Sequence, residues 1–215
     1  AKKIMEGIKQ QLWETKVEAV RCSMAMGHDT KISPEQDIDQ VMENAESEMY
    51  KDKIYNRKFI HSDMIHTIIT TLHDRSPREK MHSESVANLC QKIGQAMNLP
   101  ESEVRKLKES GYYHDIGKIV VNPTILIKQK PLSPEEKKEL QQHSVVGYKL
   151  LNLFDDTLDL AEGVYSHHER YDGTGYPKGL KGDEIPVIAR IIAIAEAFDA
   201  LTNPMSSDAV SKPEA

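Results

Sequence analysis

Residues 133–150 read SPEEKKELQQHSVVGYKL, and this stretch contains a full set of signals for the start of an α-helix. Ser133 is a preferred N-cap residue, and Pro134 suits the first helical position. The two glutamates that follow suit the positive end of the helix dipole. The helix is predicted to continue through the following positions: Leu140, His143, Val146, Gly147 and Leu150. The stretch therefore predicts a capped helix with a single histidine along it.

The same helical pattern extends over the chain from Arg75 onward. Two further stripes recur at helical spacing: Val86, Leu89, Cys90, Ile93 and Met97, then Val104, Leu107, Gly111 and His114. Helices are also predicted over 158–168 and 185–201, and no internal repeat is visible. We therefore expect a mainly α protein in which residues 75–215 form a helical bundle.

The first 74 residues have a different pattern. Apolar residues recur at a helical step near the start, residues 17–27 read as an apolar strand closed by glycine, and Ser33-Pro34 opens a second helix. Because one strand cannot form a stable sheet alone, residues 1–53 are predicted to be a piece of a small α/β domain. Residues 54–74 are predicted to form an amphipathic connector or dimerising helix, with His66 and His73 on its solvated face.

Composition excludes several classes of function. The 215 residues have a net charge of −6, so a general attraction to nucleic acid polymers or anionic membranes is not expected. No run of 18 apolar residues occurs, which predicts no membrane segment. The two isolated cysteines, Cys22 and Cys90, provide neither a disulfide framework nor a thiolate zinc cage, and a reducing cytoplasm is the simplest interpretation.

Histidines and carboxylates recur near the ends of the predicted helices. They are His82, His114-Asp115, His143, His167-His168 and the pair Glu196 and Asp199. About one helix and one loop separate successive members, so each helix of a bundle could offer ligands to a common centre. Imidazole and carboxylate together suit divalent iron, manganese or zinc, and so many ligands favour two ions over one. A lone histidine such as His82 or His143 can also be a surface or core residue without any metal.

A glycine-rich loop follows the histidine pair. Gly173 and Gly175 permit close backbone approach, and Pro177 stiffens the exit, so the loop could form a lip on a metal centre. Tyr176 could stack on a base or pack against its own domain. Positive charge nearby comes from Lys118, Arg170, Lys178, Lys181 and Arg190. Most of these are expected to be solvated, and Lys118 is the best candidate for contacting a phosphate.

Residues 75–203 resemble an HD-GYP domain, a subclass of the HD phosphohydrolases that hydrolyses cyclic di-GMP. The matching strings are His82-Ser83, His114-Asp115-Ile116-Gly117-Lys118, His143, residues 167–180 (HHERYDGTGYPKGL), Ala189-Arg190-Ile191 and residues 195–201 (AEAFDAL). The resemblance implies a metal centre ligated by His82, His114, Asp115, His143, His167, His168 and either Glu196 or Asp199, with Glu196 ranked first. It implies two divalent ions, iron or manganese, with zinc, nickel or magnesium as alternatives. Arg78 stands where some relatives have a glutamate for a third ion.

The resemblance further implies roles in catalysis and substrate binding. Asp115 and Lys118 are expected to be catalytic. Substrate contacts are expected from the following residues: Lys118, Arg170, Asp172, Gly173, Gly175, Tyr176, Pro177, Lys178 and Arg190. The usual Arg-Pro-Tyr-Arg string is replaced after Leu201 by Thr202-Asn203-Pro204, so the domain is expected to be truncated at its C-terminus.

Residues 44–53 and 20–27 resemble the final helix and the preceding strand of a GGDEF (diguanylate cyclase) domain. The signature loop of that family is absent from the sequence, so cyclase activity is not expected. The likeness implies GGDEF-domain partners, and the amphipathic pattern of residues 54–74 allows a homodimer formed through the connector helix.

Metal-assisted hydrolysis of cyclic di-GMP to linear pGpG or GMP is the favoured hypothesis. One alternative is a non-catalytic module that binds the dinucleotide or a protein partner, although a full ligand set argues against it. The other is a different HD-type nucleotide phosphohydrolase, against which the Gly-Tyr-Pro loop argues.

Overall fold

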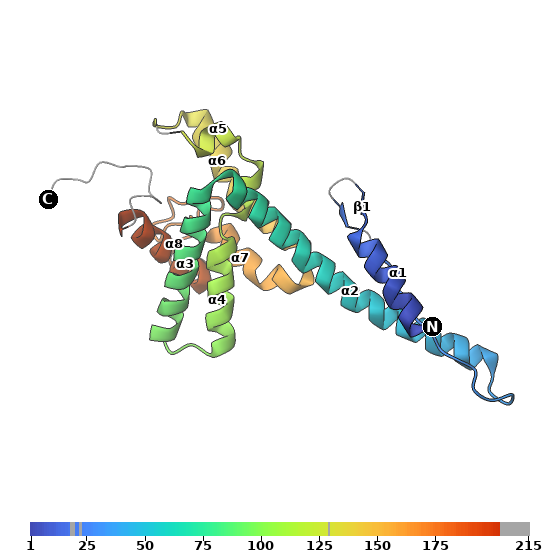
Figure 1. Ribbon diagram of the computed structural model, residues 1–215. Helices are drawn as coiled ribbons and strands as arrows, with labels where there is room; N and C mark the ends of the chain where they lie inside the picture. Colours follow the sequence, from blue (N-terminus) through green and yellow to red (C-terminus); the bar gives the residue numbers. More distant parts are fainter. Residues whose placement is uncertain (18–19, 22, 129, 203–215) are drawn as a thin grey trace. The chain divides into compact units, whose positions relative to one another are not determined.

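The computed structural model describes residues 1–17, 20–21, 23–128 and 130–202 (Figure 1). The chain divides into two compact units, Ala1–Asp63 and Met64–Ala215. Among the described residues, no helix combines the length and apolar character needed to cross a membrane. The structure is mainly helical, as predicted.

The first unit contains helix α1 (Lys2–Glu14), the two short strands β1 (Lys16–Val17) and β2 (Val20–Arg21), and the start of helix α2 (Ile38–Arg75). The strands form an antiparallel pair in which Lys16 faces Arg21. The single strand predicted over 17–27 is wrong in the part described, because Val17 and Val20–Arg21 belong to two different short strands and residues 23–27 lie in no strand; residues 18, 19 and 22 lie outside the described residues.

Residues 23–27 lie along α2 as an irregular segment instead of a strand. The Met26 N–H donates to the Asp52 carboxylate at 2.8 Å. A Cβ added at Gly27 would lie 1.9 Å from the Ala45 carbonyl oxygen, so this backbone rests directly on the helix. These contacts replace the sheet partner that a strand here lacks.

Helix α2 is continuous over positions where the sequence predicted two helices. No glycine or proline lies between Ile38 and Arg75, so no residue breaks the hydrogen-bond ladder. It ends before Ser76-Pro77, as predicted. The expectation that His73 is solvated is wrong: it is buried, and its Nε2 lies 3.3 Å from the Ser83 hydroxyl. His73 shares a helix face with the buried Ile69, whereas His66 is exposed as expected.

The second unit is the helical bundle. After α2 its elements are α3 (Pro77–Ala96), α4 (Glu101–Tyr113), η1 (Ile116–Val120), α5 (Pro123–Leu126), α6 (Pro134–Leu151), η2 (Asp155–Thr157), α7 (Leu158–Ser166), η3 (Gly182–Glu184) and α8 (Val187–Thr202). Helices α3 and α4 run alongside each other (Figure 1). The predicted N-cap at Ser133 is confirmed, and it is part of a capping box: the Ser133 hydroxyl accepts from the Glu136 N–H, and the Glu136 carboxylate accepts from the Ser133 N–H.

Two apolar clusters hold the bundle together. The first joins Ile69 and Leu72 of α2 to Ile116 and to residues of α6 and α7, and the second joins α3 and α4 to α8. The turn η1 packs closely on α6, because a Cβ at Gly117 would lie 1.9 Å from the His143 carbonyl oxygen. This close approach brings Asp115, directly before η1, next to His143.

Candidate metal centre

Six of the residues that the sequence singled out lie together in the second unit. His82 is on α3, His114 and Asp115 follow the end of α4, His143 is on α6, and His167 and His168 follow α7. All except His168 are buried, and His168 is partly exposed. Four helices that are distant in sequence therefore contribute side chains to one point.

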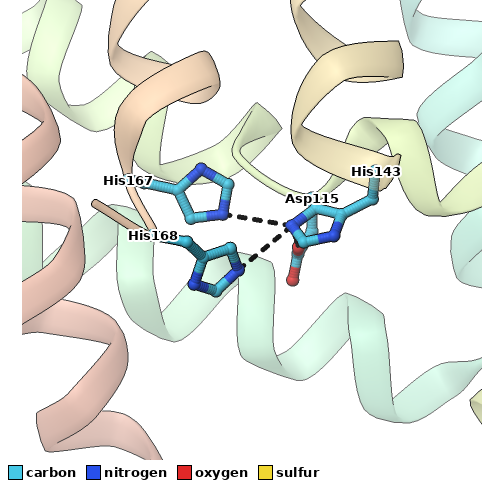
Figure 2. Close-up of side chains that lie close together, drawn as sticks. All are labelled: Asp115, His143, His167 and His168. Carbon is cyan, nitrogen blue, oxygen red and sulfur yellow. Dashed lines mark hydrogen bonds and ion pairs between the residues drawn. The ribbon is translucent and has the colours of Figure 1, made fainter. Parts of the chain in front are cut away.

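Two groups of ligand atoms share Asp115. One atom each of Asp115, His143, His167 and His168 lie within 4.8 Å of one another (Figure 2), and so do atoms of His82, His114 and Asp115. The Nε2 atom of His143 lies 3.2 Å from Nε2 of His167 and 3.1 Å from Nε2 of His168. A carboxylate shared between two groups of imidazoles is an arrangement that suits a pair of cations.

The outer nitrogen of four of these rings is held by an acceptor, which assigns the tautomer of each ring. The Nδ1 atoms of His114, His143 and His167 lie 2.8, 2.6 and 2.6 Å from the carbonyl oxygens of Gly111, Leu140 and Val164, each three residues earlier in the chain. The Nδ1 atom of His82 lies 2.7 Å from an Asp199 carboxylate oxygen. Since these oxygens only accept, each Nδ1 carries a hydrogen, and in the neutral form of each ring Nε2 presents a lone pair to the centre.

This donor set fits divalent metal ions. The Nε2 atoms of His143 and His167 are both acceptors at 3.2 Å, so their lone pairs repel unless a proton or cation lies between them. Within the described residues, neither carboxylate oxygen of Asp115 has a hydrogen-bond partner of acceptable geometry, although the Lys118 ammonium lies 2.8 Å from Oδ2. Imidazole with carboxylate is a ligand set typical of first-row divalent metals.

Burial sets the protonation of the imidazoles. It lowers the pKa of His167 and His168 well below the usual value, and the neighbouring imidazoles lower it further. Burial also lowers the pKa of His114, but the Asp115 carboxylate outweighs it and raises that pKa to about 9. For Asp115, burial raises the pKa, whereas His114 and Lys118 together hold it well below the usual range. Most of the rings are therefore neutral at pH 7, the form that binds metal.

Lys118 lies beside the centre in an ion-paired position. Its ammonium is 2.8 Å from Asp115 Oδ2 and 3.0 Å from Glu79 Oε2, and its side chain is largely buried. The two carboxylates raise the pKa of Lys118 against the lowering effect of burial. Sequence reasoning missed Glu79. Its position three residues before His82, on the same face of α3, is the signal that could have found it.

The two carboxylates on α8 lie in different places. Asp199 is buried and bonded to His82, whereas Glu196 Oε2 lies 3.8 Å from Nδ1 of His168 and its side chain is about a quarter exposed. Neither carboxylate belongs to the two groups of close ligand atoms. Burial, with a further contribution from the charge of Asp115, raises the pKa of Glu196 to about 7.

A cavity of about 890 Å³ lies against the centre. Its lining includes His167, His168, Tyr176 and Glu196, with Arg170, Asp172 and Gly175 of the glycine-rich loop. The remaining residues with an expected substrate contact are outside this lining: Lys118, Gly173, Pro177, Lys178 and Arg190. The Lys178 ammonium lies 4.8 Å from the centre of the Tyr165 ring, and Arg190 pairs with Asp183 at 3.0 Å.

The fold and this histidine–aspartate centre define the class. Residues 66–214 match the family described as HD domain, and the chain belongs to this family. It is 40% identical over 124 residues to a cyclic di-GMP phosphodiesterase of Thermotoga maritima, a match that covers 57% of this chain and 34% of that protein.

Two further relatives cover a similar share of the chain. The chain is 35% identical over 141 residues to the 3'3'-cGAMP-specific phosphodiesterase 2 of Vibrio cholerae, covering 65% of this chain and 27% of that protein. It is 37% identical over 120 residues to a cyclic di-GMP phosphodiesterase response regulator of Xanthomonas campestris, covering 55% of this chain and 32% of that protein. The chain thus spans about a third or less of the length of these curated relatives.

Proposed function

We propose that this protein is a metal-dependent phosphodiesterase that hydrolyses cyclic di-GMP to linear pGpG or GMP in bacterial second-messenger signalling. The observation that carries the proposal is the convergence of buried imidazole Nε2 atoms around Asp115, at one end of a cavity of about 890 Å³. The relatives named as cyclic dinucleotide phosphodiesterases support it. We place the protein in the HD-GYP subclass of its family.

In this proposal His82, His114 and Asp115 would hold one divalent cation, and Asp115, His143, His167 and His168 would hold a second, which follows the two groups of close ligand atoms. We propose iron or manganese, with zinc, nickel or magnesium as alternatives. When bound, such ions supply a Lewis acid that activates water and neutralises phosphate charge.

The protein's own residues hold and orient these groups. Backbone carbonyls fix the rings of His114, His143 and His167, so these rings need no reorientation to bind metal. Asp199 does the same for His82, and we therefore assign Asp199 to orienting a ligand and Glu196 to the cavity wall. Lys118 keeps a positive charge beside Asp115, where it can add to the stabilisation of a phosphate.

The cavity residues would bind the dinucleotide. Tyr176 offers a ring for stacking on a base, and Arg170 a positive charge for phosphate. Of the other residues with expected contacts, Asp172 and Gly175 also line the cavity, whereas Gly173, Pro177, Lys178 and Arg190 would act by shaping the loop and its surroundings.

A second substrate candidate is 3'3'-cGAMP, for which the Vibrio cholerae relative is specific by name. The two cyclic dinucleotides share the phosphodiester and differ in one base. A side-by-side assay of both substrates, with a linear dinucleotide and a mononucleotide ester for comparison, separates these activities from a general HD-type phosphohydrolase.

We further propose an arrangement of three parts: a GGDEF-like remnant over 1–53, a connector helix over 54–74 and the HD-GYP domain over 75–215. The sequence likeness of residues 44–53 supports the first of these assignments. GGDEF-domain proteins as partners follow from the same likeness, and a homodimer through the connector helix follows from the amphipathic pattern of that helix. Because the proposed substrate is a bacterial second messenger, we propose a cytoplasmic location.

The test combines metal analysis with turnover. Protein purified without air is expected to contain close to two metal ions per chain and to hydrolyse cyclic di-GMP, with the product identified by mass spectrometry. The double variant His114→Ala/Asp115→Ala should lose both metal and turnover, whereas His66→Ala, at an exposed position on α2, should keep both. Undiminished hydrolysis by the double variant would refute the assignment. Dinucleotide binding without stoichiometric metal would favour the non-catalytic module.

A further inference from the structure

Glu169, directly after the histidine pair, has its carboxylate buried under the glycine-rich loop. Its Oε1 accepts from the N–H groups of Lys178 at 2.6 Å and Gly179 at 3.1 Å, and its Oε2 accepts from the N–H of Leu180 at 2.9 Å. The residue is only 5% exposed. Three consecutive N–H groups that converge on one buried carboxylate form charge-assisted hydrogen bonds, which are stronger than neutral ones.

The backbone of Gly175, in the glycine-rich loop, also packs against Glu169. A Cβ at Gly175 would lie 2.3 Å from the Arg170 nitrogen and 2.5 Å from Cα of Glu169, so the backbone of Gly175 rests directly on this segment. The Tyr176 N–H donates to the His168 carbonyl oxygen at 3.2 Å. The backbone on both sides of Tyr176 is therefore fixed, before it by Gly175 and after it by the carboxylate of Glu169.

This closure determines where the Tyr176 ring lies. The ring stacks on His168, with centroids 4.8 Å apart and an angle of 28° between the planes. Both residues line the cavity beside the metal centre. Glu169 is in the cavity lining too, yet its two oxygens are engaged with backbone N–H groups on the loop side. Its carboxylate is thus turned to the loop and is absent from both groups of close ligand atoms.

We propose that Glu169 is a positioning residue: it clamps residues 178–180 and so holds Tyr176 against His168 as a wall of the site for the cyclic dinucleotide. The assignment rests on the proposed function for its substrate. It predicts that loosening the clamp weakens the binding of a substrate large enough to fill the cavity and leaves the metal ions and their chemistry in place.

The experiment uses Glu169→Gln in the metal-loaded protein. Glutamine has nearly the same shape but offers one acceptor oxygen in place of two. Glu162→Gln, at an exposed position on α7, is the matched control for the loss of one negative charge. In Glu169→Gln we expect the amides of residues 178–180 to exchange with D₂O at least about tenfold faster, because a charge-assisted bond is lost. The control should exchange like the parent protein.

Kinetics with two substrates give the second readout. In the proposed function cyclic di-GMP occupies the cavity, whereas bis(p-nitrophenyl) phosphate is a small ester chosen to need only the metal centre. Glu169→Gln should raise KM for cyclic di-GMP about tenfold with kcat within twofold, and kcat/KM for the small ester and the metal content should stay unchanged. In a Tyr176→Ala background most of the KM effect should disappear, because Glu169 acts through Tyr176.

Unchanged amide exchange would overturn the proposal. So would an equal loss on both substrates together with loss of metal, because Glu169 would then support the metal centre itself. A parent protein that hydrolyses neither substrate would instead refute the proposed function. The exchange rates and the KD of cyclic di-GMP, measured by calorimetry in the two variants, would still decide the role of Glu169.

Discussion

Replacing Asp199 with asparagine tests whether this carboxylate orients His82. The carboxylate oxygen lies 2.7 Å from Nδ1 of His82, and both residues are buried. An asparagine of the same shape can turn its NH₂ group to Nδ1, which would move the ring hydrogen to Nε2 and remove the lone pair from the metal centre. Loss of such an outer partner typically weakens metal binding about 10–100-fold, or about 1.4–2.7 kcal/mol.

The measurement is a titration of the metal-free protein with Mn²⁺ in competition with a fluorescent chelator. Asp159→Asn is the matched control, because the side chain of Asp159 is 84% exposed and 3.8 Å from Lys106. The control should bind Mn²⁺ like the parent protein. Affinity unchanged within twofold in Asp199→Asn would refute the orienting role. A loss well beyond a thousandfold, with one fewer ion per chain, would make Asp199 a direct ligand.

Three more predictions concern the packing and charge of the same domain. Gly117→Ala should lower the free energy of unfolding in urea by about 3 kcal/mol, because the new Cβ would overlap the His143 carbonyl. The control Gly7→Ala, in the open middle of α1, should leave that free energy unchanged or raise it by about 0.5–1 kcal/mol. Lys118→Met should lower the free energy of unfolding of the metal-free protein by about 3–5 kcal/mol, because it leaves buried carboxylates unpaired. Adding Glu79→Gln should restore part of this stability, and a loss below about 1 kcal/mol in Lys118→Met would contradict this reasoning. Burial raises the pKa of the Cys90 thiol to about 12, so at pH 8 iodoacetamide should label Cys90 at least about a hundredfold more slowly in the folded than in the unfolded protein. Peptide mass spectrometry measures the labelling, and equal rates would refute the burial of Cys90.

Local signals in the sequence were sufficient for most helix boundaries. Ser76-Pro77 ends one helix and caps the next, and Ser133 with Glu136 forms the capping box, because these side chains satisfy backbone N–H groups within three residues. The prediction over 17–27 failed because contacts with Ala45 and Asp52, distant in sequence, set that segment. The two helices predicted on either side of residue 54 form one continuous helix, because no breaker residue is present between them.

The sequence by itself determined that the chain forms a helical bundle with imidazoles and one aspartate spaced a helix apart, because helix periodicity, caps and residue type are local properties. Only the tertiary structure decided which nitrogen of each ring faces the centre, that Asp199 bonds His82, that Glu79 pairs with Lys118 and that Glu169 clamps the loop. The last three depend on an atom contributed by a more distant residue, at distances between 2.6 and 3.1 Å. The rings of His114, His143 and His167 bond carbonyls three residues earlier, and only the packing of their helices turns the Nε2 atoms to one centre. Hydrogen bonds act only at such distances, and folding alone brings the partners that close.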